Sequence, residues 1–156
     1  MELFGGAVTL DLPDGLLDAS QIRQVPDNQE VFLSREDSSF SIIVEIVEPP
    51  SEPVAEDSLA AYYFQDLAEE TDSAFTVSDQ GRDHNINGTL VWISGHLQCM
   101  NLKETRQSSC FMTVIVLNEV SAHILITWNN CKLSCEQILT HCRSWSVKDW
   151  SLFATK

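Results

Sequence analysis

Two apolar segments of strand length follow one another closely in the C-terminal half of the chain. Residues 111–117 and residues 122–128 are almost entirely apolar, and four residues separate them. Both segments contain several β-branched side chains, and the short connection predicts an antiparallel hairpin. Because neither segment alternates polar with apolar side chains, we expect both faces of this hairpin to be buried. A sheet of this kind requires a layer of helix or chain on each side.

The rest of the chain supplies further segments of strand character. Residues 40–47 form the strongest of them, rich in β-branched side chains and stopped by Pro49 and Pro50. Residues 81–88 are polar and are predicted to be a loop. Weaker strand patterns cover residues 7–12, 30–33, 75–78 and 89–98.

Three helices are predicted between the strands. Asp18 is placed to cap a short helix that ends near Val25, because Pro26 follows. A second helix is expected to begin near Pro53, with a buried stripe and with exposed acids. The stripe consists of Ala60, Tyr63, Phe64 and Leu67, and the exposed acids are Asp66, Glu69 and Glu70.

The third helix is expected over residues 134–145. Ser134 followed by Gln137 matches a capping box, and an apolar face follows it at the spacing i, i+3, i+4, i+7. Together these elements predict one α+β domain over residues 1–156, with a mainly antiparallel sheet and helices on both faces. A chain of this length can bury a core without a metal or disulfides.

The five cysteines are better explained by core packing than by a metal. Cys135 and Cys142 lie on the apolar face of the third predicted helix with Ile138 and Leu139, and no CxxC pair occurs. A zinc site from Cys131, Cys135, His141 and Cys142 is therefore disfavoured. We expect no metal and no cofactor.

Charge is concentrated in one part of the chain, whose formal net charge is −14. Residues 36–81 hold 12 of the 23 acids and contain no lysine or arginine. Nucleic-acid binding is disfavoured, because contacts to phosphates need basic side chains in number. An acidic surface instead attracts a basic protein partner, although the same acids could serve solubility alone. No apolar stretch is long enough to span a membrane.

Motifs of catalysis are missing from the sequence. It contains no glycine-rich phosphate loop, GxSxG elbow, HExxH motif or dinucleotide-binding fingerprint. His123 lies in an apolar segment and is interpreted as a buried core histidine. A small hydrolase built on a carboxylate, or on a Cys–His pair such as Cys142 with a nearby histidine, remains an alternative, but the residues favour a binding protein over an enzyme.

One family resemblance covers the N-terminal third densely and the rest in patches. Its most specific motif is the run VPDNQEVF that ends at Phe32, and the chain resembles the Mog family of Ran guanine-nucleotide release factors. Five shorter blocks add to it. These are residues 3–7, 12–13 and 18–20, the strand SIIVEIVE that ends at Glu48, and the helix motif YYFQDL that ends at Leu67. Residues 124–129 and 151–153 also fit late blocks of the family.

The resemblance implies a fold and a partner. The fold is a Mog/PsbP-like α/β/α sandwich, and the partner is Ran, the small GTPase of nuclear transport. The implied activity is to bind Ran and to promote release of its nucleotide, GTP in particular, which supports protein transport between nucleus and cytoplasm. An acidic adaptor that binds Ran or another basic partner without nucleotide release is the alternative. We expect a monomer that resides in nucleus and cytoplasm.

The family's Ran-binding acids fall on Glu45 and Glu48 in this sequence, inside the base-free stretch. Strand alternation places these two side chains on opposite faces, so they share a surface only if the strand bends or ends before Pro49. The neighbouring segment is a second candidate for the same surface; it consists of Asp27, Asn28, Gln29 and Glu30. For Asp27 an ordinary turn role competes with this assignment.

The sequence also departs from the family pattern. Members are usually longer, and residues 72–88 match no family block. His123 stands where an aspartate is common, and Asn130 where a proline often follows the late strand. These departures concern local geometry more than the choice of partner.

Overall fold

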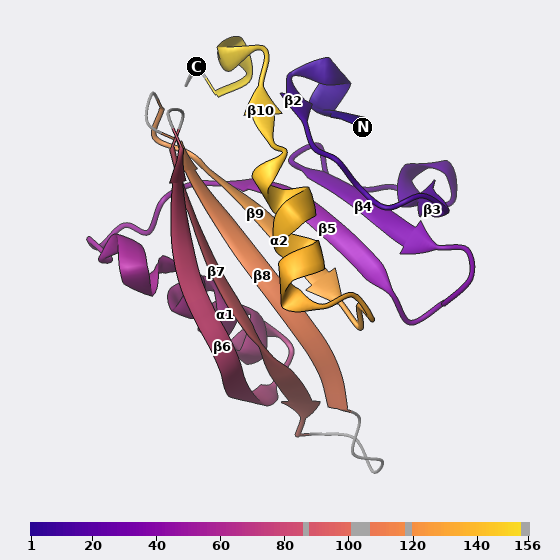
Figure 1. Ribbon diagram of the computed structural model, residues 1–156, viewed down its shortest axis with the longest axis vertical. Helices are drawn as coiled ribbons and strands as arrows, with labels where there is room; N and C mark the ends of the chain where they lie inside the picture. The colour runs from indigo at the N-terminus through magenta and orange to yellow at the C-terminus, as the bar shows by residue number, and fades with distance from the viewer. Residues whose placement is uncertain (86–87, 101–106, 118–119, 154–156) are drawn as a thin grey trace.

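A seven-stranded antiparallel sheet forms the centre of the computed structural model, which describes residues 1–85, 88–100, 107–117 and 120–153 (Figure 1). Its strand order is β3-β4-β5-β9-β8-β7-β6, and every neighbouring pair is antiparallel. The strands are β3 (Leu16–Asp18), β4 (Gln29–Ser34), β5 (Ser41–Val47), β6 (Ser73–Asn85), β7 (Gly88–Cys99), β8 (Gln107–Leu117) and β9 (His123–Asn129).

A small second sheet brings the two ends of the chain together. Its order is β1-β2-β10, and short 3₁₀ helices flank it at the top of Figure 1. Its strands are β1 (Glu2–Leu3), β2 (Val8–Thr9) and β10 (Ser146–Val147), and the flanking helices are η1 (Phe4–Gly6) and η4 (Trp150–Phe153).

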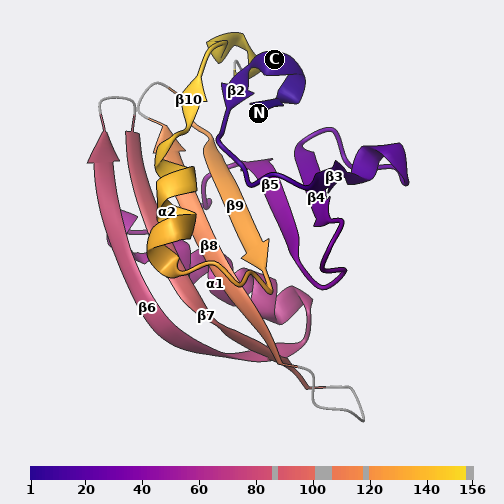
Figure 2. The ribbon, with the colours of Figure 1, turned by 45° about the vertical axis from the view of Figure 1, so that its right-hand side comes forward.

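The two α-helices lie on opposite faces of the large sheet (Figure 2). On one face, α1 (Leu59–Glu70) buries Tyr63 and Phe64 against β7 and β8. On the other face, α2 (Cys135–Arg143) buries Ile138 and Cys142 in a larger core that also holds the N-terminal segment. The predicted α+β architecture with helices on both faces is therefore confirmed.

The hairpin predicted from the two apolar segments is present as β8 and β9, in register from Cys110 opposite Asn129 to Val116 opposite His123. Nearly every residue of the two apolar segments, 111–117 and 122–128, is buried, as their sequence predicts, whereas the first residues of β8 are polar and more exposed. The Ser134–Gln137 capping box is also confirmed, although α2 ends at Arg143 and not at Trp145.

The loop prediction for residues 81–88 is wrong. β6 continues to Asn85 and β7 begins at Gly88, with residues 86–87 outside the described part. β6 is the edge strand and its side chains are largely exposed, so it is polar where a central strand would be apolar. Gly81 pairs with Trp92 within the strand, and glycine fits there because a Cβ would lie only 2.7 Å from Cζ2 of Trp92.

Three helix and strand boundaries also differ from the sequence expectation. Residues 7–12 contribute β2, two residues long, to the second sheet. Asp18 does act as a cap, since its side chain accepts from Ser20 N, but the helix is a single 3₁₀ turn, η2 (Ala19–Gln21). Pro53 precedes the second helix, which begins as a 3₁₀ turn, η3 (Glu56–Ser58), and continues as α1.

The backbone at Asn130 explains one departure from the family pattern. Asn130 has φ of 53°, a left-handed conformation that asparagine tolerates and that the proline ring, with φ fixed near −65°, cannot adopt. Its backbone N–H also donates to the carbonyl of Ser109 at 2.8 Å, which a proline would lose.

Candidate functional site

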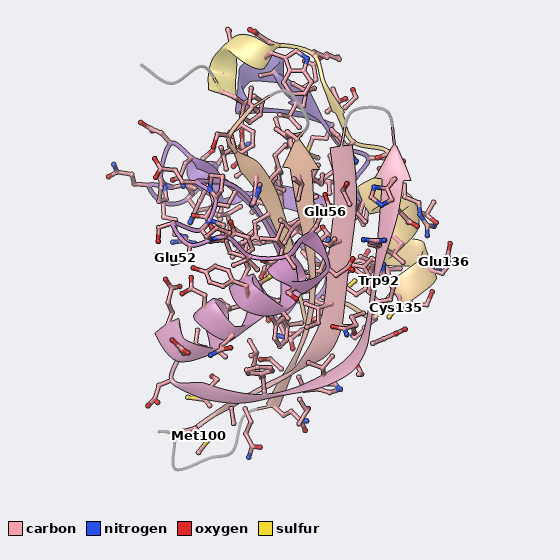
Figure 3. The ribbon with its side chains drawn as sticks, turned by 90° about the vertical axis from the view of Figure 1, so that its left-hand side faces the viewer. Glu52, Glu56, Trp92, Met100, Cys135 and Glu136 are labelled. Atoms are coloured by element: carbon pink, nitrogen blue, oxygen red, sulfur yellow. The ribbon has the colours of Figure 1, made fainter. Side chains whose placement is uncertain are left out.

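A groove opens on the α1 face of the sheet because α1 covers only part of that face. The helix packs over β7 and β8, and Ile43, Glu45 and Val47 of β5 line the groove beside it. The groove has a volume of about 550 Å³. Its floor comes from β5, β9 and β8, one wall from α1 and one end from the segment after β5. In Figure 3 this face is toward the viewer: Glu52 and Glu56 mark the segment that leads into α1, whereas Cys135 and Glu136 lie on α2 beyond the sheet.

Four carboxylates line this groove, which we call the acidic groove. Glu45 and Glu48 come from β5 and its end, and Asp66 and Glu70 come from one side of α1. Three of the six predicted site residues, Gln29, Glu45 and Glu48, are therefore brought together by the structure. The helix acids were expected only to face solvent, and nothing in the sequence indicates that α1 lies beside the end of β5.

The carboxylate of Glu45 is held in place by the first residue of β4 and the residue before it. Its Oε1 accepts hydrogen bonds from Gln29 Nε2 at 2.9 Å and from Asn28 Nδ2 at 3.2 Å. Gln29 is the cross-strand neighbour of Glu45, which explains the contact. Within the described residues no donor reaches the other oxygen, Oε2. Glu45 is thus a partly buried, oriented acceptor with one oxygen left for a partner.

Glu48 reaches the same groove because β5 ends at Val47. The backbone carbonyl of Glu48 accepts a hydrogen bond from Tyr63 Oη at 3.2 Å, and Pro49 and Pro50 follow. Glu48 is exposed, and its carboxylate forms no ion pair within the described residues. Burial raises the pKa of Tyr63 to about 12, with smaller contributions from Tyr62 and Asp66, so the hydroxyl keeps its proton.

Apolar and aromatic groups complete the groove between the acids. Ile43, Val47, Met112 and Leu125 contribute to its floor, and Tyr62 lies at its α1 wall, 42% exposed. Tyr62 packs edge to face against Tyr63, with ring centroids 5.2 Å apart. Such a surface can pair with cations and cover aliphatic side-chain stems at the same time.

The basic side chains that form ion pairs in the described residues do so away from the groove. Arg82 pairs with Asp57, Lys132 with Asp37, Arg143 with Asp83 and Glu136, and Lys148 with Glu2. No lysine or arginine lines the groove in this part of the chain. Among residues 1–85, 88–100, 107–117 and 120–153, therefore, no cation neutralises the groove acids.

The other predicted site residues separate into different environments. Asn28 and Gln29 support Glu45, as described above. Glu30 follows Gln29 in β4, so its side chain lies on the opposite face of the sheet. Its Oε1 accepts a hydrogen bond from the backbone N–H of Phe4 at 2.7 Å, which ties the N-terminal segment to β4. Asp27 is exposed and does not line the groove.

The geometry of the cysteines does not support the hydrolase alternative. Cys142 is fully buried, Thr113 Oγ1 donates to its sulfur at 3.6 Å, and burial raises the pKa of the thiol to about 12. A nucleophilic cysteine needs an accessible thiolate. In the described residues no three His, Cys, Asp or Glu side chains are arranged to hold a metal ion. None of the described helices is long and apolar enough to cross a membrane.

Comparison with known families identifies the chain. Residues 1–131 match the family described as Ran-interacting Mog1 protein. The chain belongs to the Mog1 family. This match confirms the resemblance found in the VPDNQEVF and SIIVEIVE motifs.

Curated Mog1 relatives align best over part of the chain. The nuclear import protein mog1 of Schizosaccharomyces pombe is 43% identical over 74 residues, which cover 47% of this chain and 38% of that protein. The human Ran guanine nucleotide release factor is 45% identical over 65 residues, covering 42% of this chain and 34% of that protein. These alignments thus span little more than a third of the relatives. A probable Ran guanine nucleotide release factor of Dictyostelium discoideum aligns over 97% of this chain and 94% of its own length, at 25% identity.

Solved structures confirm the predicted fold. The crystal structure of the Saccharomyces cerevisiae Ran-binding protein Mog1p matches with a TM-score of 0.75 at 23% identity, covering 99% of this chain and 97% of that one. The solution structure of cyanobacterial PsbP from Synechocystis matches with a TM-score of 0.64 at 12% identity, covering 94% and 90% of the two chains. The fold is therefore Mog/PsbP-like.

Proposed function

We propose that this chain binds the small GTPase Ran through the acidic groove and promotes release of its bound guanine nucleotide, GTP in particular. The observation that carries the proposal is the set of four groove carboxylates, beside which the described residues place no lysine or arginine. Membership of a family described as Ran-interacting supports the choice of partner. In this assignment Glu45 and Glu48 contact basic residues of Ran, and Asp66 and Glu70 extend the surface along α1.

Nucleotide release follows from linkage between two ligands of one protein. If the groove binds nucleotide-free Ran more tightly than loaded Ran, it weakens nucleotide binding by the same factor. A 10⁴-fold effect requires roughly 5.5 kcal/mol of differential binding. In GTPases a P-loop lysine and Mg²⁺ hold the phosphates, and carboxylates that dock nearby compete for that lysine or repel the phosphates.

The proposed role is binding without a chemical step, so the chain acts as a release factor and not as an enzyme that makes or breaks bonds. Two yeast relatives are named nuclear import proteins, which supports action in both nucleus and cytoplasm. We propose that the chain acts as a monomer and needs neither nucleic acid nor membrane.

The decisive experiment measures release of a fluorescent guanine nucleotide from Ran, with and without an excess of this protein. We expect the wild type to accelerate release from Ran-GTP and the variant Glu45→Lys/Glu48→Lys to lose this effect. The matched control is Glu36→Lys/Asp79→Lys, which makes the same charge change in the same base-free stretch but outside the groove. It should retain most of the activity.

The outcomes separate the competing functions. A stable complex with unchanged release would favour the adaptor alternative. Absence of any complex with Ran would overturn the proposed partner. Thermal unfolding of each variant should stay close to that of the wild type, and collapse of the groove variant alone would show that Glu45 and Glu48 are needed for folding instead.

A further inference from the structure

Two buried polar contacts link the start of β9, helix α1 and the residue that follows β5. Tyr63 Oη lies 2.9 Å from His123 Nδ1 and 3.2 Å from the carbonyl oxygen of Glu48. Tyr63 and His123 are 8% and 7% exposed, and their rings meet edge to face with centroids 6.0 Å apart. One hydroxyl therefore joins α1, β9 and the residue that follows β5.

The proton positions follow from the atoms involved. A carbonyl oxygen can only accept, so the bond to Glu48 uses the single proton of the Tyr63 hydroxyl. The contact with His123 then requires that the histidine donates, which places a proton on Nδ1. The result is a directed relay in which His123 Nδ1–H donates to Tyr63 Oη, and Tyr63 Oη–H donates to the Glu48 carbonyl.

The relay acts at the point where strand pairing stops. Val47 opposite His123 is the last pair between β5 and β9, and Glu48 is the next residue. Pro49 restricts the backbone of Glu48 to extended conformations but supplies no N–H to hold it. The Tyr63 hydroxyl supplies the missing hydrogen bond to the carbonyl of Glu48.

This contact accounts for a feature that strand alternation alone does not give. In a continuing strand Glu45 and Glu48 would lie on opposite faces. In the structure both line the acidic groove, because the chain leaves the strand at Glu48. We propose that His123 and Tyr63 are positioning residues, which fix the backbone of Glu48 so that its carboxylate joins that of Glu45 in the groove.

The inference rests on the proposed function for its binding readout, and Ran is the probe. Tyr63→Phe keeps the ring and removes both hydrogen bonds, and His123→Leu removes the donor. We expect each to weaken the affinity for Ran about five- to tenfold, the size of one or two neutral hydrogen bonds. His123→Asn keeps an N–H close to the position of Nδ1 and should restore affinity to within about twofold of wild type.

A double-mutant cycle separates positioning from general damage. If Tyr63 acts through Glu48, then Tyr63→Phe should change affinity less than about twofold in a Glu48→Ala background. An equal loss in both backgrounds would overturn the inference. His123 lines a hollow beside Pro53 and Glu56 and not the acidic groove, so it can affect Ran binding only through Tyr63. Full affinity of His123→Leu would therefore also overturn the inference.

An NMR measurement tests the relay without Ran. The ¹⁵N shifts of His123 at pH 8 should show the Nδ1–H tautomer in the wild type, and the Glu48 carbonyl ¹³C shift should change in Tyr63→Phe. An Nε2–H tautomer in the wild type would overturn the relay. If Ran fails to bind the wild type, the proposed function fails, and this measurement decides the relay alone.

Discussion

Glu45 differs from an ordinary surface acid because two amide side chains hold one of its oxygens. Asn28 and Gln29 donate to Oε1, and Asn28 also donates to the carbonyl of Ile46 at 3.2 Å. An oriented carboxylate loses less conformational entropy on binding than a mobile one. In the proposed complex, Asn28 and Gln29 therefore hold Glu45 in its orientation before Ran binds.

The variant Asn28→Ala/Gln29→Ala tests this support at the level of single side chains. We expect a three- to tenfold loss of affinity for Ran, since Glu45 keeps its charge but loses its fixed orientation. Titration calorimetry would measure it, with Asn28→Ala/Gln29→Ala in a Glu45→Ala background as the control. A loss of the same size in that background would contradict a role through Glu45.

His123 gives the folded state a defined sensitivity to acid. Burial lowers the pKa of His123 below its ordinary value of 6.5, so at mildly acidic pH the unfolded chain binds a proton that the folded chain does not. The free energy of unfolding therefore falls as the pH is lowered from 6.5 towards the pKa of folded His123, and it rises again as the pH is raised over the same range.

Denaturant unfolding at pH 7, 6 and 5 should therefore show a larger loss of stability for the wild type than for His123→Asn. The same substitution at the exposed His96 serves as the control and should leave the wild-type pH dependence in place. A pH dependence that His123→Asn does not reduce would show that other groups dominate acid unfolding.

At the scale of elements, the position of α1 determines both the groove and half of its charge. Asp66 and Glu70 line the groove, whereas Glu69 lies on the same helix outside it. The variant Asp66→Lys/Glu70→Lys should lose at least tenfold in affinity for Ran, and Glu69→Lys should lose less than about threefold. Surface plasmon resonance at one fixed salt concentration compares them directly. Equal losses would mean that net charge, and not the groove, governs binding.

The capped helix α2 provides the opposite case, an element needed for stability and remote from the groove. Ser134 Oγ accepts from Gln137 N, and Gln137 Oε1 accepts from Ser134 N at 2.9 Å. Ser134→Ala should lower the free energy of unfolding by about 1 kcal/mol. Urea unfolding measures that change, and the affinity for Ran should stay at the wild-type value because α2 covers the other face of the sheet.

These elements also show how far the sequence could predict the molecule. The β8–β9 hairpin and the cap of α2 follow from local pattern and local hydrogen bonds, so both were predictable. Residues 81–88 were predicted to be a loop although β6 extends to Asn85, because an exposed edge strand needs no apolar alternation. Glu45 and Glu48 were found through the family motif, but Asp66 and Glu70 join them only through tertiary packing. The relay through His123 depends on three elements that no local pattern connects.

For the whole molecule, the uneven charge distribution should influence how fast a partner arrives. The formal net charge is −14, and the base-free stretch that contains the four groove acids holds 12 of the 23 acids. A field of this kind accelerates association with a basic surface, and salt screens it over about 8–10 Å at physiological ionic strength.

We expect the association rate constant with Ran to fall about tenfold or more between roughly 20 and 300 mM NaCl, with the dissociation rate constant changing much less. Stopped-flow fluorescence measures both. Glu36→Gln/Asp79→Gln should reduce this salt dependence slightly without changing dissociation. Glu45→Gln/Glu48→Gln should speed dissociation as well, because those two carboxylates contact Ran in the proposed complex. If added NaCl changed mainly the dissociation rate constant, the acids outside the groove would not steer the encounter with Ran.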